Sequence, residues 1–106
     1  MKVTMNEDLK ELYSNGSRSK YYKDVARNQV LLKGFIQAVN TMKSVQRAED
    51  LKAFSRLHYE KLKYGFSGLS SVRLSNSYVH RLIFKENDDE IEIELIEIDD
   101  THYGTK

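Results

Sequence analysis

The residues best suited to chemistry in this sequence are basic, and they surround its most hydrophobic segment. Arg73 and Arg81 both stand between apolar neighbours in the stretch 70–84, and Lys61 and Lys63 lie just upstream of it. Guanidinium groups match pairs of phosphate oxygens, and lysine adds a point charge. Four such cations on one surface, with no paired acid, would form a binding site for a phosphate or another anion. The alternative is ordinary surface charge whose stems cover apolar area.

Two further side chains that could act on RNA follow the last hydrophobic segment of the chain. His102 is a candidate acid or base beside a basic surface, although a lone histidine near a chain end is more often idle. Tyr103 could stack on an unpaired base. His58 and His80 are weaker candidates: we expect His58 to contact RNA, and His80, which alternates with core residues, to fill a structural position.

No metal or cofactor is predicted from this sequence. It has no cysteine and only three histidines, which are widely dispersed. It also has no glycine-rich phosphate loop and no closely spaced histidines with acids on one helix. The three histidines are too dispersed in the sequence to indicate a metal site.

The elements expected to position these residues are strands of a small sheet. A period of two begins after Phe54 and predicts strands over 56–64, 69–75, 78–86 and 90–99. In such strands Arg73 points away from Val72, and Arg81 points away from Leu82. If the apolar residues pack under helices, both arginines emerge on the open face of the sheet. The two lysines are two residues apart, so they too should share a face, with no paired acid in the same strands.

The rest of the pattern predicts an α+β fold of one domain over residues 1–106. We expect an edge strand over 1–5, a helical turn in 6–13, a long helix over 20–43 and a shorter helix over 48–54. Gly34 inside the long helix suggests close packing. The result is a small curved antiparallel sheet, made of an N-terminal strand and a four-stranded meander, with two helices on one face.

The last strand contains a break in its alternation. Ile91, Ile93 and Leu95 share one face, but the phase slips at Leu95–Ile96. Ile98 would therefore point the other way unless a β-bulge intervenes.

Charge is unevenly distributed along the 106 residues. Residues 1–85 carry 16 Lys/Arg and 7 Asp/Glu, whereas residues 86–106 carry one Lys and 9 Asp/Glu. This pattern is typical of a basic working surface beside an acidic edge, or of ordinary solvated charge. The N-terminus has no long apolar run, so we expect no signal peptide, no membrane association and a cytoplasmic protein.

Three stretches resemble the RelE/ParE toxin superfamily, and specifically its HigB-like branch. They are "RAEDLKAF", "LHYEKLKYGFSGLSSVRLSNSYVHRLIF" and "IELIEIDDTHYG". The resemblance covers nearly all of the chain from about residue 20, and it is most specific in the hairpin and the tail. It departs from the commoner pattern by extra residues in the hairpin turn and by the order of His102 and Tyr103.

The resemblance implies the toxin of a type II toxin-antitoxin system. Such a toxin would be a ribosome-dependent mRNA endoribonuclease (an mRNA interferase), which inhibits translation and arrests growth. The 2′-hydroxyl of the mRNA would attack the adjacent phosphate without a metal. By position, the catalytic residues would be Lys61, Lys63, Arg73, Arg81 and His102, with His58 and Tyr103 binding RNA.

The resemblance also implies partners and leaves alternatives open. The partners would be the ribosome, mRNA and a cognate HigA-like antitoxin with a helix-turn-helix DNA-binding domain. The superfamily also contains ParE-like inhibitors of DNA gyrase with no nuclease activity, so the fold does not settle the activity. A third alternative is an inactive relative that only binds its antitoxin.

Overall fold

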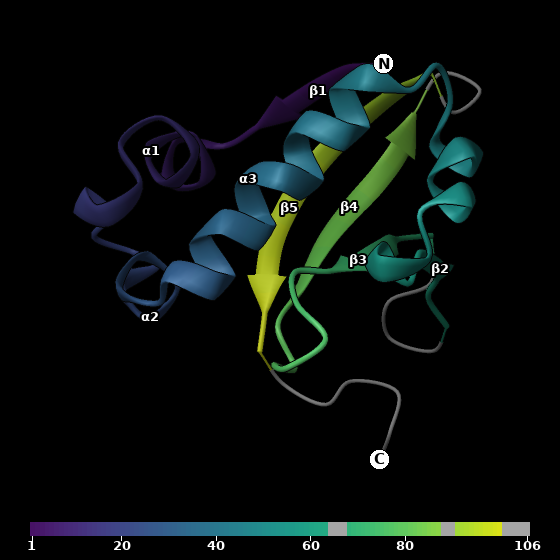
Figure 1. Cartoon of the computed structure of the whole chain (residues 1–106). Helices are drawn as coiled ribbons and strands as arrows, with labels where there is room; N and C mark the ends of the chain where they lie inside the picture. The colour runs from purple at the N-terminus through teal and green to yellow at the C-terminus, as the bar shows by residue number, and fades with distance from the viewer. Residues whose placement is uncertain (64–67, 88–90, 101–106) are drawn as a thin grey trace.

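Five strands form one sheet in the computed structural model, which describes residues 1–63, 68–87 and 91–100. The strand order is β1-β5-β4-β3-β2 (Figure 1). The strands are β1 (Lys2–Met5), β2 (Glu60–Lys61), β3 (Ser70–Arg73), β4 (Arg81–Asn87) and β5 (Glu92–Asp99). Neighbouring strands from β2 to β5 are antiparallel, and β1 lies parallel to β5 at the edge. The predicted N-terminal edge strand and four-stranded antiparallel meander are confirmed, but the expectation that the edge strand is also antiparallel is wrong.

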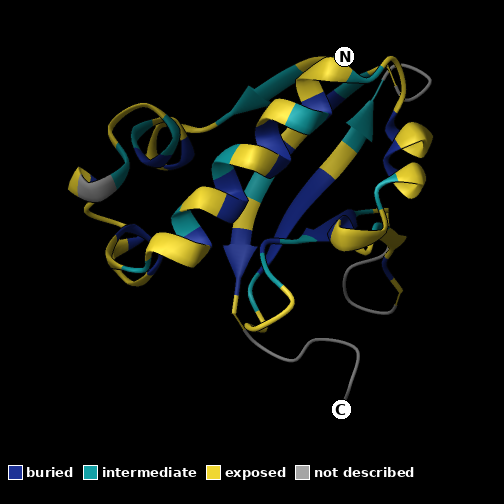
Figure 2. Ribbon diagram, viewed as in Figure 1, coloured by how far each residue is buried: buried dark blue, intermediate teal, exposed yellow. Residues whose placement is uncertain are grey.

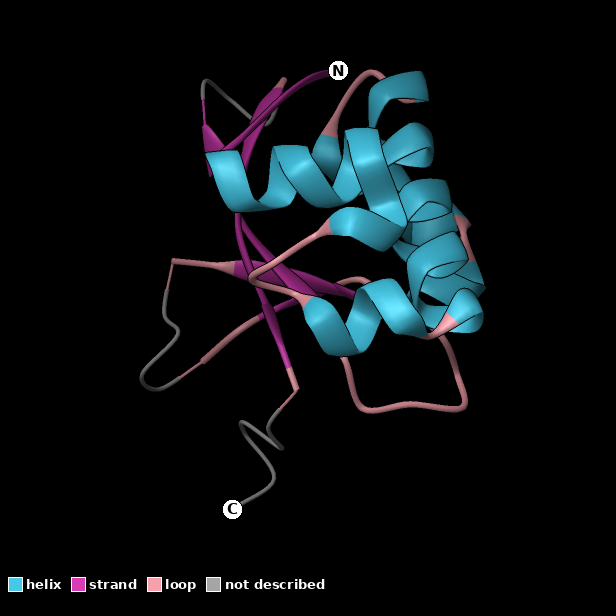
Figure 3. Ribbon diagram, turned by 90° about the vertical axis from the view of Figure 1, so that its left-hand side faces the viewer, coloured by secondary structure: helices cyan, strands magenta, loops and turns pink. Residues whose placement is uncertain are grey.

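The helices lie on one side of this sheet (Figure 3). They are α1 (Glu7–Asn15), α2 (Lys23–Arg27) and α3 (Gln29–Ser44), with short 3-10 helices η1 (Gly16–Arg18), η2 (Ala48–Ala53) and η3 (Ser55–Leu57). The α+β class with helices on one face is therefore confirmed, although the segment 48–54 forms a 3-10 helix. None of the described helices has the length and apolar character needed to cross a bilayer.

The single long helix predicted over 20–43 is wrong, because Asn28 divides it into α2 and α3. The Asn28 backbone is extended, and its side-chain oxygen accepts hydrogen bonds from the N–H groups of Val30 and Leu31 at 3.0 and 3.2 Å. This is the geometry of a helix N-cap. Asn6 caps α1 in the same way through the N–H of Leu9. The expected helical turn there is a helix of nine residues.

Gly34 lets α3 approach the end of β3 closely, as expected. A Cβ atom at this position would lie 2.0 Å from the carbonyl oxygen of Leu74. No side chain fits at that distance. The contact fixes how α3 lies across the sheet, and therefore how the β3–β4 hairpin is held.

The hydrophobic core fills the space between the helices and the inner face of the sheet. Figure 2 shows the buried residues along the inner side of α3 and along the central strands. The fully buried side chains include Leu9, Leu12, Phe35, Val39, Met42, Leu51, Val72, Leu82, Phe84 and Ile93. The strands that carry Arg73 and Arg81 are thus anchored by their alternate residues.

Of the two alternatives for the last strand, a reversed Ile98 or a β-bulge, the structure has the bulge. Ile83 pairs with Glu97 and Phe84 pairs with Leu95, so one extra residue stands between these pairs on β5. The bulge returns Ile98 to the core face, where it pairs with Leu82. Ile91, expected to share this buried face, precedes β5 and is 49% exposed.

Candidate functional site

Arg73 and Arg81 lie directly opposite each other on β3 and β4. The next pair in the register is Val72 with Leu82, and both of these residues belong to the core under the helices. Because successive strand residues point to opposite faces, the two arginines face away from the helices. We call this surface the arginine face: Arg73, Arg81 and Ser71 with Glu60 of β2, which pairs with Ser71.

Arg81 is buried in this face, which contradicts its expected position as an open side chain. The residue is only 7% exposed. Its Nε donates a hydrogen bond to the Ser71 hydroxyl at 2.7 Å, and its Nη2 donates to the main-chain carbonyl of His58 at 2.6 Å. A guanidinium held by two such bonds is fixed in orientation, because its planar fork leaves little freedom once both ends are engaged.

A carboxylate lies beside Arg81, although the sequence pattern suggested an unpaired cationic surface. Glu60 Oε1 is 3.4 Å from Arg81 Nη2, and the Glu60 side chain is 55% exposed. Asp99 of β5 is the register partner of Arg81 and is buried on the same face. The expectation of cations without a paired acid is therefore wrong. The arginine face combines guanidinium groups with carboxylates.

The two lysines do not join the arginines, so the expected cluster of four cations is wrong. Lys61 pairs with Ser70, which shares the helix-side face with Phe84. Its Nζ lies 4.0 Å from Glu86, a carboxylate that also accepts a hydrogen bond from the Ser70 hydroxyl. Lys63 is exposed and lies beyond the end of β2. The sequence predicted a strand over 56–64, whereas the paired residues of β2 are only Glu60 and Lys61.

Arg73 forms fewer hydrogen bonds and ion pairs with the described residues than Arg81 does. Its Nε is buried and has no hydrogen-bond partner, and Arg73 forms no ion pair with any residue that the structure describes. It also faces Arg81, a like charge, across the two strands. Of the two guanidinium groups on this face, that of Arg73 is therefore the one more available to an anionic ligand.

His58 contributes to the site through its backbone. It has a φ of 47°, in the left-handed region, and it ends η3. This turn brings its carbonyl oxygen to Arg81. The exposed imidazole lies 3.0 Å from the side-chain oxygen of Asn76, in the β3–β4 turn. Contact between His58 and RNA stays a prediction.

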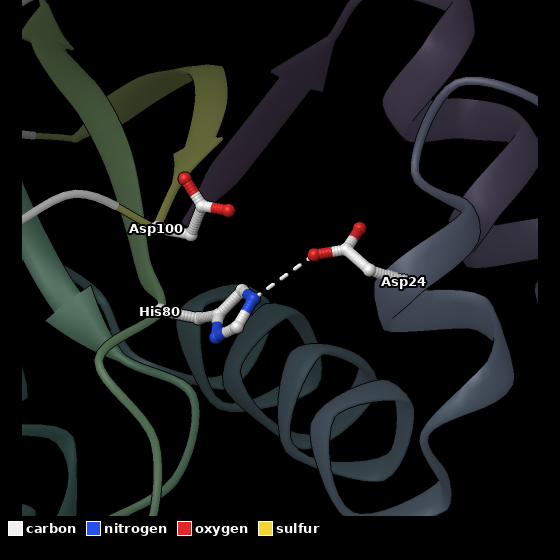
Figure 4. Close-up of side chains that lie close together, drawn as sticks. All are labelled: Asp24, His80 and Asp100. Atoms are coloured by element: carbon white, nitrogen blue, oxygen red, sulfur yellow. Dashed lines mark hydrogen bonds and ion pairs between the residues drawn. The ribbon is translucent and has the colours of Figure 1, made fainter.

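His80 lies on the other side of the sheet from Arg81 and pairs with an acid, which agrees with its expected structural position. Its Nε2 is 3.1 Å from Asp24 Oδ2, in α2, and its side chain is 13% exposed (Figure 4). Burial tends to raise the pKa of Asp24, but hydrogen bonds from His80 and the backbone, with the charge of His80, hold that pKa below its ordinary value.

His102 and Tyr103 lie outside the described residues, which end at Asp100, so their roles stay predictions. Glu60 is the residue of the candidate site that sequence reasoning missed. Its only signal was its place next to Lys61 in the basic segment. The strand register, which the sequence did not reveal, puts Glu60 rather than Lys61 on the arginine face.

The arginine face can hold an anion and accept a proton at the same place. Arg73 and Arg81 supply positive charge from a rigid sheet, and Glu60 offers an exposed carboxylate close to Arg81. A carboxylate that is ionised at neutral pH can act as a general base if a hydroxyl comes within hydrogen-bond reach. This combination suits the transfer of a phosphoryl group.

Solved structures of bacterial toxins share this fold. A YoeB-YefM complex from Staphylococcus aureus matches with a TM-score of 0.55 and 24% identity, covering 97% of this chain and 98% of that chain. A YoeB/ParE toxin from Agrobacterium tumefaciens matches with a TM-score of 0.54 and 15% identity, covering 96% and 100%. A YoeB dimer from Staphylococcus aureus matches with a TM-score of 0.52 and 20% identity, covering 97% and 98%.

The chain therefore has the fold seen in these YoeB and YoeB/ParE toxins. The resemblance inferred from the sequence is confirmed at the level of the fold. No family model matches the sequence, and no curated protein matches it. The HigB-like branch stays a prediction.

Proposed function

We propose that this protein is the toxin of a type II toxin-antitoxin system and that it cleaves mRNA on the translating ribosome. The observation that carries this proposal is the Glu60–Arg81 pair, with Arg73 opposite, on the face of the sheet away from the helices. The fold shared with YoeB and YoeB/ParE toxins supports the class of protein. The proposal further places the protein in the cytoplasm, where its substrate is.

The proposed reaction uses the 2′-hydroxyl of the RNA as its nucleophile. Glu60 takes the proton from this hydroxyl, and the oxygen attacks the adjacent phosphorus. Arg73 and Arg81 stabilise the phosphorane, whose negative charge is greater than that of the phosphodiester. The P–O5′ bond then breaks, and the 5′ oxygen receives a proton, which we assign to His102. The products are a 2′,3′-cyclic phosphate and a 5′-hydroxyl end.

The two arginines have different parts in this proposal. Ser71 and the His58 carbonyl already hold the Arg81 guanidinium in place. It therefore does not have to reorient when negative charge develops on the phosphorane oxygens. Arg73 forms no ion pair with any described residue, so its positive charge is available to a phosphate oxygen. Tyr103 would stack on a base of the bound mRNA. Lys61 is given no role in the proposed reaction, because it lies on the helix-side face of the sheet.

The proposed partner is an antitoxin that holds the toxin inactive. The matched Staphylococcus aureus structure is of a complex between YoeB and YefM. A cognate antitoxin for this chain would have to cover the arginine face or block entry into the ribosome. Whether it is HigA-like, with a helix-turn-helix domain, depends on the HigB-like assignment.

Induction of the chain in cells, followed by mapping of mRNA 5′ ends, tests the proposal. We expect growth arrest and new 5′ ends inside translated reading frames. The same mRNA with its start codon removed should stay intact, because the reaction needs a translating ribosome. If mRNA stays intact in both forms while plasmid DNA loses negative supercoils, the chain is a gyrase inhibitor and the proposal is wrong.

A further inference from the structure

Three side chains from distant parts of the chain meet at one end of the sheet. Asp24 belongs to α2, His80 directly precedes β4, and Asp100 directly follows β5. One ligand atom from each lies within 4.8 Å of the other two. Figure 4 shows the three side chains close together, with the imidazole bonded to Asp24. We propose that Asp24, His80 and Asp100 bind a divalent transition-metal ion of the Zn²⁺ type, at a site separate from the arginine face.

The distances suit ligands of one small ion. His80 Nε2 and Asp24 Oδ2 are 3.1 Å apart. Two ligands of one tetrahedral zinc ion are about 3.3 Å apart, given bonds of about 2.0–2.1 Å. Asp24 and Asp100 are both exposed, so rotation of their side chains can bring the third ligand within range. His80 is the fixed member, since its ring is largely buried.

The charges at the cluster also favour a cation. Two carboxylates stand close together, and neither forms an ion pair with a lysine or arginine among the described residues. Asp24 is stabilised by the His80 imidazole and by backbone N–H groups, none of which carries a permanent charge. A divalent ion would balance both negative charges. Nitrogen and carboxylate donors together select ions such as Zn²⁺ over Ca²⁺ or Mg²⁺, which take oxygen ligands.

The surroundings of His80 Nδ1, the ring nitrogen that would not bind the metal, determine how high an affinity we expect. His80 Nδ1 is buried and has no hydrogen-bond partner. The ring is thus oriented toward the two acids through Nε2, at the cost of an unpartnered Nδ1. A metal-bound histidine usually donates its other N–H to an acceptor, and loss of such a partner lowers affinity about 10- to 100-fold. We expect moderate binding, with water completing the coordination.

The ion would connect the helical layer to the sheet. Asp24 lies in α2, whereas His80 precedes β4 and Asp100 follows β5, at the end of the sheet where Arg81 pairs with Asp99. A bound metal would therefore restrain α2 against the sheet and raise the melting temperature. It would also hold Asp100, the residue that immediately precedes the segment 101–106. The cluster takes no part in the proposed cleavage.

A metal titration of the purified full-length chain tests this inference without any cleavage assay. After dialysis against a chelator, Zn²⁺ binding is measured by calorimetry, and Co²⁺ binding by its visible absorption. We expect one equivalent to bind and the melting temperature to rise with Zn²⁺. Asp24→Asn and Asp100→Asn should each lower the affinity at least about tenfold and remove most of the thermal shift. Both residues are exposed, so these variants should fold.

Matched controls locate the ion. Asp8→Asn changes an exposed aspartate in α1, and His58→Gln changes an exposed histidine outside the cluster; both should bind Zn²⁺ as the parent does. His102→Gln should also bind normally. The inference is overturned if the parent binds no equivalent, if binding survives in both Asp24→Asn and Asp100→Asn, or if His58→Gln or His102→Gln abolishes it.

Discussion

Arg81 of β4 and Glu60 of β2 are joined across the intervening strand β3, with 3.4 Å between Nη2 and Oε1. Arg81 is buried whereas the Glu60 side chain is more than half exposed, so the pair presents its carboxylate to solvent. A buried cation that orients an exposed base is a suitable arrangement for a substrate that brings its own nucleophile. It also means that Arg81 supports both the fold and the proposed chemistry.

Replacement of Arg81 should therefore affect stability as well as cleavage. Arg81→Ala leaves the Ser71 hydroxyl and the His58 carbonyl without their donor, and we expect the free energy of unfolding to fall by about 1–3 kcal/mol. Urea unfolding followed by circular dichroism measures this change. Arg81→Lys keeps the charge but loses the fork, so it should recover part of the stability and little of the cleavage. An Arg81→Ala protein as stable as the parent would contradict the buried position.

Replacement of Arg73 should lower the rate of cleavage but leave the free energy of unfolding almost unchanged. No described residue accepts a hydrogen bond from its Nε–H, and its neighbour Arg81 carries a like charge. We expect Arg73→Ala to change the free energy of unfolding by less than about 1 kcal/mol. Cleavage should fall about 10²- to 10³-fold, the usual loss for one donor to a transition-state charge. Normal cleavage by a folded Arg73→Ala protein would show that Arg73 takes no part in the reaction.

Replacement of Gly34 should destabilise the protein although alanine is the better helix former. The added Cβ would lie 2.0 Å from the Leu74 carbonyl oxygen, so α3 and β3 must separate. We expect the free energy of unfolding to fall by about 1–3 kcal/mol or more. Helix propensity alone predicts a gain of about 1 kcal/mol. Gln37→Ala, on the exposed side of the same helix, is the control, and a stabilised Gly34→Ala protein would refute the close contact.

Removal of residues 101–106 should abolish cleavage and leave the fold intact. Ile93 and Leu95 anchor β5 by burial upstream of the deletion, at about 1.5–3 kcal/mol for each fully buried side chain. Cleavage should be lost because His102 and Tyr103 are removed. Circular dichroism and a melting curve check the fold, and the full-length double variant His102→Ala, Tyr103→Ala checks that the side chains are responsible. A truncated chain that still cleaves mRNA would exclude both residues from the reaction.

Much of the fold could be predicted because alternation and turns are local. The hairpin that carries Arg73 and Arg81 follows from the period of two, and the slip near Ile96 marks where a bulge or a reversed face was to be expected. The division of the long helix at Asn28 was missed, because apolar spacing runs through a capping residue without interruption. A cap depends on the backbone conformation of one residue, which periodicity does not report.

The site was less predictable, because it depends on register and on distant contacts. Lys61 rather than Glu60 was placed beside the arginines, and a shift of one residue in β2 reverses that choice. The burial of Arg81 depends on a left-handed His58, and the Asp24–His80–Asp100 cluster joins residues from three separate segments. No local pattern in the sequence reports such contacts.

The chemistry of the RNA ends made by the Glu60→Gln variant tests the proposed reaction most directly. In a reconstituted translation reaction with one defined mRNA, the parent protein should produce 5′-hydroxyl and 2′,3′-cyclic phosphate ends only while ribosomes translate. Glu60→Gln should lower the rate about 10²- to 10⁴-fold, because glutamine cannot accept the proton. Its stability should change by at most about 1 kcal/mol. Glu49→Gln, an exposed glutamate in η2, should cleave normally. Cleavage by Glu60→Gln at the parent rate, or 5′-phosphate ends from the parent protein, would contradict a reaction in which Glu60 activates the 2′-hydroxyl.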